Sequence, residues 1–473
     1  METTGHLLQL SEGDIDKFDE HAFEILSKTG IHVPEDQFLS RMSEAGFEVR
    51  REDRRILFDR ALCEEYLAKV PGAFTLGGRS EEDDLALDGS SMLVRPQSGC
   101  PNVLDTDTGA CRPAVLRDVE RMAVLNDSLP HIRLAASLLY PSDIQSEHRD
   151  LAALVTILKN SRKHVYVQPY TPESMERMVE IAVCLRGSPE EVRRRSPLTV
   201  ILGGTSPLVF SPNEIGVLRI AAENGIPIMC GSTPMNGATG PVTLAGEIVL
   251  HHAENLAGLV FSQVILEGAP VSYGIRPSTM DIRTGASVWG SVEWGMMTAA
   301  LLQIAASHGF LRDTVGLSTD SKLSDAQAGM EKGMSALFSA LWGANVAAGA
   351  GFIETIMTGS YEQMVIDNDL AGIMERVRRG IPVDEERLAT SLIEEIGPGG
   401  NYLTDPHTLK FMREEVFIPG VLDRNLRYRW KNEGSRETAA VARERARGLI
   451  DSHTVPAFPE EIAREIDRIA GLS

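Results

Sequence analysis

The chain has 473 residues, of which 43% are hydrophobic and 24% are charged, and its formal net charge is −21. This composition is typical of a globular protein, and the acidic excess argues against nucleic acid or an anionic membrane as the main partner, because both attract clustered Lys and Arg. The length suits two or three domains, or one elaborated (β/α)₈ barrel.

The chain shows no signature of export or of membrane insertion. Its start, METTGHLLQLSEG, has no basic region followed by an apolar run, so we expect no signal peptide. The apolar stretches are shorter than the ~20 residues of a spanning helix. Five cysteines without CxxC spacing indicate reduced thiols rather than disulfides or a cysteine-type zinc site. We therefore expect a cytoplasmic protein.

The first part of the chain predicts helices followed by a small β region. Apolar periodicity predicts helices over residues 12–29, 35–46 and 59–69. Between 74 and 113 short apolar patches alternate with Gly, Ser, Asp and Thr, which predicts a small antiparallel excursion rather than part of a βα repeat. We interpret residues 1–114 as an N-terminal extension of helices and short strands.

From residue 115 to residue 400, short apolar segments alternate with longer amphipathic ones. Regular alternation of this kind favours a closed parallel (β/α)₈ barrel, a TIM barrel. Seven strands can be assigned, one fewer than the barrel needs, and no GxGxxG or GxxxxGK[ST] motif supports a nucleotide-binding open sheet. The expected strands cover 132–138, 164–170, 198–203, 226–230, 270–274, 314–317 and 345–350. The expected helices cover 149–158, 174–184, 212–223, 244–259, 292–307 and 326–342.

Residues 401–473 form a charged tail with three expected helices, over 405–416, 437–449 and 459–469. We expect this tail to pack on the outside of the barrel or on a neighbouring subunit. The tail also leads us to expect a homo-oligomer.

The expected active end of the barrel contains two segments of small and hydroxyl residues. In TIM barrels the chemistry lies past the C-terminal ends of the strands. GGTSP at 203–207 and CGSTP at 230–234 follow two consecutive strands and predict a broad, open cavity mouth. The alternative is that both are ordinary βα turns that cap the following helices.

A long loop after the strand at 270–274 contains the most suggestive charges. Arg276 and Asp281 lie in this loop, and Tyr273 lies at the strand end. A guanidinium beside an aromatic ring suits a zwitterion, because the carboxylate can bind the arginine and the cationic group the ring face. A structural ion pair between Arg276 and Asp281 is the competing interpretation.

The histidines do not predict a metal site. His251 and His252 are adjacent in an expected helix, where neighbouring side chains diverge by roughly 100° and cannot both face one ion. No HExxH or HxH motif occurs, and no GxSxG motif marks a nucleophile. We therefore expect no metal held by this chain.

Several long motifs resemble one known family. DSKLSDAQAGMEKG, WGANVAAGAGFIE and LDRNLRYRWKNEG resemble the trimethylamine methyltransferase superfamily, and the resemblance runs almost from end to end. It implies a TIM barrel that binds a methylated amine in its mouth and transfers a methyl group to the cob(I)alamin of a separate corrinoid protein. The corrinoid would therefore arrive on a partner protein.

One departure from the family bears on the substrate. The trimethylamine enzymes carry pyrrolysine in the later half of the barrel, whereas this chain has ordinary residues throughout. Relatives without pyrrolysine are associated with quaternary amines such as glycine betaine. A tertiary amine must be activated before it can leave, while a quaternary one is already activated, so this departure implies a quaternary amine as the methyl donor.

The resemblance, joined to the barrel prediction, gives candidate site residues. Asp320 and Glu354 are the candidate catalytic groups near strand ends. The candidate substrate-binding residues fall into three groups. Tyr166, Tyr273 and Phe352 would form the walls of an aromatic cage around the cationic group, and Arg276 would bind the carboxylate. Asp281, Gln327 and Asn345 are polar candidates at the mouth. Two other functions remain open. One is a corrinoid-independent barrel hydrolase or lyase acting on a small polar metabolite, and the other is a non-catalytic ligand-binding homologue.

Overall fold

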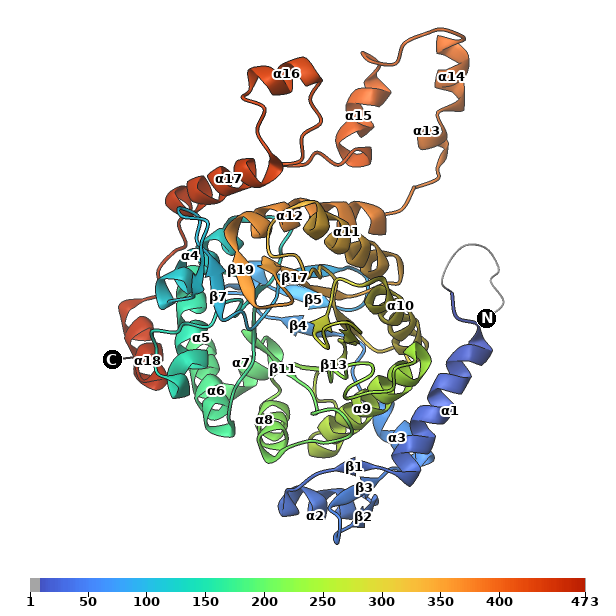
Figure 1. Ribbon diagram of the computed structural model, residues 1–473, viewed down its shortest axis with the longest axis vertical. Coiled ribbons are helices and arrows are strands. Elements are labelled where there is room, and N and C mark those ends of the chain that lie inside the picture. The colour runs from blue at the N-terminus through green and yellow to red at the C-terminus, as the bar shows by residue number, and fades with distance from the viewer. Residues whose placement is uncertain (1–8, 473) are drawn as a thin grey trace.

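Eight parallel strands form a closed barrel at the centre of the computed structural model, which describes residues 9–472 (Figure 1). In chain order the strands are β6 (Leu93–Pro96), β9 (Ala135–Ala136), β10 (Val165–Val167), β11 (Leu198–Leu202), β12 (Ile228–Cys230), β13 (Val271–Ile275), β16 (Arg312–Val315) and β17 (Val346–Ala350). The Leu134 amide, directly before β9, donates to the Val94 carbonyl of β6 at 3.2 Å, so the two end strands of the sheet meet. The predicted TIM barrel is confirmed.

A short helix, α7 (Pro189–Arg194), precedes β11, and one longer helix after each strand covers the outside of the barrel. The longer helices are α4 (Leu116–Ser128), α5 (Arg149–Asn160), α6 (Pro172–Arg186), α8 (Pro212–Glu223), α9 (Leu244–Ile265), α10 (Val292–Ser307), α11 (Ala326–Leu341) and α12 (Tyr361–Arg378). Local sequence explains several starts: Thr171 and Ser211 cap α6 and α8, and each helix has Pro in its first turn.

The eighth strand, β6, lies where the sequence predicted a separate antiparallel excursion. It pairs with β17 in parallel, and all four of its residues are buried. The prediction missed it because Arg95 and Pro96 interrupt the apolar run by which a buried strand is recognised. The barrel therefore begins at Leu93, before residue 115.

Short strands of the N-terminal part close the lower end of the barrel. A hairpin of β4 (Phe74–Leu76) and β5 (Leu85–Leu87) places Leu76 and Leu87 in one apolar cluster with Leu93, Leu311 and Val346. Leu93 and Val346 are the first residues of their strands, and Leu311 directly precedes one. The hairpin therefore seals the N-terminal ends of the strands and leaves the opposite mouth as the open end.

The remaining N-terminal elements pack on the outside. They are α1 (Glu12–Lys28), β1 (Ile31–His32), α2 (Asp36–Glu44), β2 (Glu48–Arg50), β3 (Arg55–Leu57) and α3 (Arg60–Leu67). The three strands form an antiparallel sheet of order β1-β3-β2. A second small sheet combines β7 (Asn102–Leu104) and β8 (Cys111–Pro113) with β18 (Phe352–Ile353) and β19 (Thr358–Ser360) beside the mouth. Helix α1 contacts α9 and α10.

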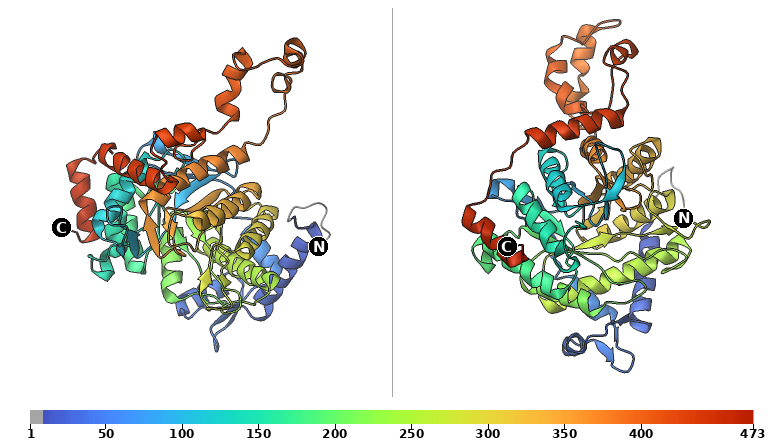
Figure 2. Two further views of the ribbon diagram at one scale, coloured as in Figure 1. Left: turned by 45° about the horizontal axis from the view of Figure 1, so that its top comes forward. Right: turned by 60° about the vertical axis from the view of Figure 1, so that its left-hand side comes forward.

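The tail consists of a projecting arm and two packed helices. The arm, residues 381–437, contains α13 (Glu385–Leu388), α14 (Thr390–Ile396), α15 (Pro406–Glu415) and α16 (Arg427–Asn432) and extends beyond the barrel (Figure 2). Its base rests on α12, where Arg376 pairs with Glu415 at 3.0 Å. Helix α17 (Thr438–Ser452) returns to pack on α12 and α4, and α18 (Glu460–Ala470) packs on α5 and α6. Within residues 9–472 no helix is both long and apolar enough to cross a membrane.

Candidate active site

A cavity of about 340 Å³ lies at the C-terminal ends of β10 to β13. Gln168, Gly203, Gly231 and Arg276 follow these four strands directly and line the cavity. Its other lining residues are Ile201, Leu202, Gly204, Thr205, Ser206, Thr233 and Thr239. Both small-residue segments that the sequence analysis singled out therefore border the open mouth of the barrel.

Glycines at the strand ends let the backbones of neighbouring strands approach each other closely. They also keep side chains out of the mouth. A Cβ atom on Gly203 would lie 2.0 Å from the Gly231 carbonyl oxygen, and one on Gly231 would lie 2.5 Å from the Gly274 carbonyl oxygen. Real Cβ atoms do not approach backbone this closely, so these close strand ends require glycine. The space left above them is available to a small ligand.

Arg276 brings a positive charge to the cavity without a carboxylate beside it. Its amide donates to His251 Nε2 at 3.1 Å, and its Nη2 lies 3.4 Å from Met229 Sδ. Within residues 9–472, no Asp or Glu forms an ion pair with it; Asp281 instead pairs with Arg283 at 2.9 Å. The alternative of an Arg276–Asp281 ion pair is therefore wrong.

Burial lowers the pKa of Arg276 to about 10, and the nearby Arg95 guanidinium is the second cause of this shift. The side chain still carries its charge near neutral pH, but the surroundings oppose that charge. An anionic group in the cavity would relieve this cost. The chemistry of Arg276 therefore suits a carboxylate ligand.

Below Arg276, a buried ion pair fills the barrel interior. Arg95 Nη2 donates to Asp313 Oδ1 at 3.3 Å, and the Arg95 guanidinium lies 4.5 Å from the centre of the Tyr166 ring. Burial raises the pKa of Asp313, against the opposing effect of Arg95 and Arg276. Two guanidinium groups thus face one carboxylate, which leaves the region positive.

Sequence reasoning missed Arg95 and Asp313. Arg95 lies in the strand that was not recognised, and Asp313 lies just before the segment assigned to its strand. A charged residue inside an otherwise apolar strand is the signal that could have found both, because such residues are rarely buried without a partner.

The three predicted cage walls do not meet. Tyr166 lies inside the barrel beneath Arg95. The Tyr273 hydroxyl instead contacts His252 Nδ1 at 2.9 Å under α9, on the outer face of β13. Phe352 is fully buried beside Lys332, whose Nζ lies 4.6 Å from the ring centre. An aromatic cage built from these rings is therefore wrong.

Asp320 holds three mouth segments together. Its carboxylate accepts from the amides of Trp289 and Gly290 at 2.9 and 2.8 Å and from Thr355 Oγ1 at 2.6 Å. These bonds join the loop after β13 to the loops after β16 and β17. With its oxygens already engaged, Asp320 is positioned to fix the mouth rather than to transfer a proton.

Glu354 lies at the start of an unusual backbone turn. Glu354, Thr355 and Ile356 have φ angles of 57°, 49° and 64°, so three consecutive non-glycine residues adopt the left-handed conformation. Each such residue costs about 1–2 kcal/mol, and strain of this kind concentrates at functional sites. The Glu354 amide donates to the Ser321 carbonyl at 2.7 Å, while its carboxylate accepts from Thr358 Oγ1 at 2.8 Å.

The remaining predicted residues lie elsewhere. Asn345 directly precedes β17 at the N-terminal end of the barrel, where its Oδ1 accepts from the Arg312 amide at 2.9 Å, so its assignment to the mouth is wrong. Gln327 lies on α11 and donates to Glu331 at 2.8 Å. Asp281 accepts the amides of Arg283 and Thr284 in an exposed turn.

The N-terminal half of α9 brings two buried carboxyl groups to the mouth loops. Glu254 accepts from Ser206 Oγ and from the Leu208 amide, both at 2.7 Å. Glu247 is fully buried against Gly240, and neither of its oxygens has a hydrogen-bond partner within residues 9–472. Burial raises the pKa of Glu247 to about 8, and the charge of Glu254 is the second cause of this shift.

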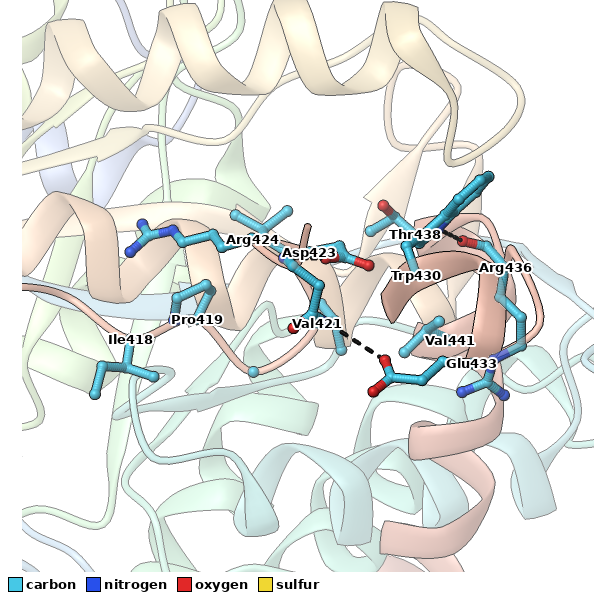
Figure 3. Close-up of a pocket in the computed structure, with 13 residues that line it drawn as sticks. Ile418, Pro419, Val421, Asp423, Arg424, Trp430, Glu433, Arg436, Thr438 and Val441 are labelled. Atoms are coloured by element: carbon cyan, nitrogen blue, oxygen red, sulfur yellow. Dashed lines mark hydrogen bonds between the residues drawn. The ribbon is translucent and has the colours of Figure 1, made fainter. Parts of the chain in front are cut away.

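A larger cavity of about 510 Å³ lies on the tail (Figure 3). It forms between the segment 418–425 and helices α16 and α17, and the Trp430 indole donates to the Arg436 carbonyl at 3.1 Å at its edge. No barrel strand end reaches it. We therefore assign the chemistry to the smaller cavity, where the strand ends converge on Arg276.

Comparisons with known proteins identify relatives along the whole chain. Residues 2–470 match the sequence model of the family described as Trimethylamine methyltransferase (MTTB). The chain is 32% identical over 455 residues to glycine betaine methyltransferase of Desulfitobacterium hafniense strain Y51, covering 96% of this chain and 94% of that protein. It is 32% identical over 462 residues to trimethylamine methyltransferase MttB of Methanosarcina barkeri, covering 94% of this chain and 91% of that protein.

A solved structure supports the fold. The monomethylamine methyltransferase MtmB of Methanosarcina barkeri superimposes with a TM-score of 0.51 over 94% of this chain and 95% of that one. The two sequences are 13% identical. This similarity concerns the arrangement of the chain and carries no information about the substrate.

Proposed function

Because this chain belongs to the trimethylamine methyltransferase family, we propose that it moves a methyl group from a carboxylated quaternary amine to the cob(I)alamin of a corrinoid protein. Glycine betaine and related betaines are the substrates that fit best. Both glycine betaine and trimethylamine methyltransferases occur among the relatives. The choice between the two substrate classes therefore depends on the residues of this chain.

The unpaired Arg276 in the mouth cavity carries this proposal. Trimethylamine has no anionic group, so it would leave this guanidinium without a partner. A betaine carries a carboxylate that can form two parallel hydrogen bonds with the guanidinium. Glycines 203 and 231 leave room above the strand ends for the rest of such a small molecule.

The proposed reaction needs positioning rather than acid–base chemistry. A quaternary nitrogen leaves as a neutral tertiary amine, so no proton has to be supplied. The reduced corrinoid of the partner protein supplies the nucleophile. The task of this chain is to bind the carboxylate at Arg276 and to orient a C–N bond toward the open mouth. We assign Asp320 to this task as the residue that fixes the mouth loops.

Binding by the variant Arg276→Ala tests the proposal. We expect the affinity for glycine betaine to fall by about 1.5–3 kcal/mol, the scale of a hydrogen bond to a charged group. Calorimetric titration of glycine betaine, and of proline betaine or carnitine if that is the better ligand, measures the change. Choline, which lacks the carboxylate, should bind the parent protein and the variant alike.

Arg283→Ala is the matched control for this experiment. Arg283 lies in the same loop, but its side chain is 84% exposed and paired with Asp281. The control should bind betaine like the parent protein. A betaine affinity that is the same with and without the Arg276 guanidinium would contradict the proposed substrate class.

A further inference from the structure

Two histidines and an aspartate, on or directly after three separate helices, converge on the outside of the barrel. Asp19 lies on α1 and His252 on α9, and His308 directly follows α10. Asp19 Oδ1 lies 2.8 Å from His252 Nε2 and 3.0 Å from His308 Nε2. All three atoms lie within 4.8 Å of one another. The residues are far apart in the sequence, so the fold itself assembles this group.

The donor atoms match those of a divalent metal. Zinc binds imidazole nitrogen and carboxylate oxygen at about 2.0–2.2 Å. In a tetrahedral site, this places neighbouring donor atoms about 3.3 Å apart. The measured separations from Asp19 are close to this spacing, so a small adjustment of the side chains would seat an ion. Two imidazoles and one carboxylate also favour zinc over magnesium or calcium, which prefer oxygen donors.

Burial supports a bound ion as well. His252 is fully buried, while the side chains of Asp19 and His308 are 13% and 23% exposed. The partial exposure of the other two ligands leaves a path for the ion and a position for water as fourth ligand.

A further contact orients one of the ligands. His252 Nδ1 lies 2.9 Å from the Tyr273 hydroxyl, which is itself buried under α9. Histidines that bind metal commonly hold the other ring nitrogen in such a contact, which fixes the ring and its tautomer. With a metal on Nε2, Nδ1 carries the proton and donates to the Tyr273 oxygen.

The charge of Asp19 has no other strong partner. Among the described residues, the only ion pairs of Asp19 are those with His252 and His308. A mostly buried carboxylate between two imidazoles gains more from a divalent cation than from neutral hydrogen bonds.

We propose that Asp19, His252 and His308 form a structural divalent-cation site, with zinc as its natural occupant. The site fastens α1 to α9 and α10, away from the mouth cavity. Its role is therefore to hold the N-terminal helix on the barrel, and the proposal is independent of the substrate.

Zinc binding by the purified full-length chain tests this proposal. The protein is stripped with a chelator, dialysed against zinc, and analysed for zinc per chain and for its melting temperature. We expect one zinc per chain and a higher melting temperature with zinc. Asp19→Asn and His308→Ala should lose this zinc and this shift. Tyr273→Phe should keep the site but bind zinc about tenfold more weakly, because a metal-binding histidine that loses the hydrogen bond to its other ring nitrogen typically loses affinity on this scale.

A matched control distinguishes the site from ordinary surface histidines. His131 Nδ1 lies 2.8 Å from Glu375 Oε2, a histidine–carboxylate pair that no third metal-binding side chain joins within residues 9–472. His131→Ala should bind zinc like the parent chain. If Asp19→Asn or His308→Ala fails to fold, the parent chain is loaded with Co²⁺ in place of zinc. Absorption bands of tetrahedral Co²⁺ would then show that the site binds a metal. A parent chain without stoichiometric zinc and without these bands, or folded ligand variants that bind like the parent, would overturn the proposal.

Discussion

At the scale of single residues, the barrel mouth is organised by buried charges. Arg95 pairs with Asp313 inside the barrel, and Arg276 above them shares the influence of Asp313 but forms no ion pair within residues 9–472. Buried charges without partners are costly, so such a residue signals an interaction that the isolated chain does not complete. The same reasoning applies to Glu247, whose oxygens have no hydrogen-bond partner in the described part of the chain.

Glu247 predicts a pH dependence of stability. Its pKa is about 8 in the folded chain and near 4.5 when exposed. The folded state therefore binds more protons than the unfolded state between these values. The stabilisation is complete below pH 4.5 and is lost as pH rises through about 8. Glu247→Gln should therefore become more stable relative to the parent chain as pH rises over this range.

Melting temperatures of the two proteins, measured from pH 5 to 9, test this prediction. Glu293→Gln serves as the control, because Glu293 is exposed on the first turn of α10. Its difference from the parent chain should stay constant with pH. A constant difference for Glu247→Gln as well would show that burial does not shift this carboxyl.

At the scale of elements, buried side chains lock the later strands to their helices. Lys332 on α11 donates to the carbonyls of Leu317 and Gly349 at 3.0 and 2.9 Å and pairs with Asp367 on α12 at 2.8 Å. Asp367 also accepts from the Gly351 amide at 2.8 Å. One buried ion pair thus fixes the ends of β16 and β17, from which the mouth loops start.

Removing one partner of this pair should be strongly destabilising. Asp367→Asn leaves the Lys332 ammonium buried without a countercharge, so we expect the free energy of unfolding to fall by about 3–5 kcal/mol. Denaturant unfolding measures the change. The exposed pair of Lys410 and Glu386 provides the control, since Glu386→Gln should cost less than about 1 kcal/mol. Equal effects at the two sites would contradict the structural role of the buried pair.

The elements themselves could largely be predicted from sequence. Apolar periodicity located six of the eight barrel helices and seven strands because these segments are long or uniformly apolar, whereas α4 and α12 were not assigned. Strand β6 was missed because Arg95 breaks its apolar run. No local pattern shows that a charged side chain inside a barrel has a partner more than 200 residues away, as Arg95 has in Asp313.

The candidate site was predicted only in part. Arg276 lies in the mouth cavity, but Tyr273 does not, and the alternation of a strand explains the difference. Residues 273 and 276 are an odd number of positions apart, so their side chains point to opposite faces. Asn345 shows a second limit, because it directly precedes β17 and therefore lies at the N-terminal end of the barrel rather than at the mouth.

At the scale of the whole molecule, helices α13, α14 and α16 of the arm project away from the barrel (Figure 2). The base of the arm contacts α12, where Asp369 accepts from the amides of Gly420 and Val421. The arm exposes large apolar side chains, among them Ile381 at 85%, Leu403 at 75% and Leu409 at 64%. Extended apolar surface of this kind marks an interface. We propose that the arm packs on a second copy of the chain, since reciprocal exchange of two arms would cover both at once.

Self-association can be measured by light scattering after size exclusion. The parent chain should be a dimer or larger at micromolar concentration, and Leu403→Asp combined with Leu409→Asp should shift it toward the monomer. Ile282→Asp is the control, because Ile282 is 88% exposed in a loop of the barrel mouth. A parent chain that is monomeric would contradict the proposed role of the arm.

The central claim is methyl transfer from a carboxylated quaternary amine to reduced cobalamin. A spectral assay with chemically reduced cob(I)alamin, repeated with a cognate corrinoid protein, tests it most directly. We expect methylcobalamin to form with a betaine and not with trimethylamine, and Arg276→Ala to slow the betaine reaction. Methylation by trimethylamine alone would contradict the substrate class, and no methylation by any methylated amine would contradict the activity itself.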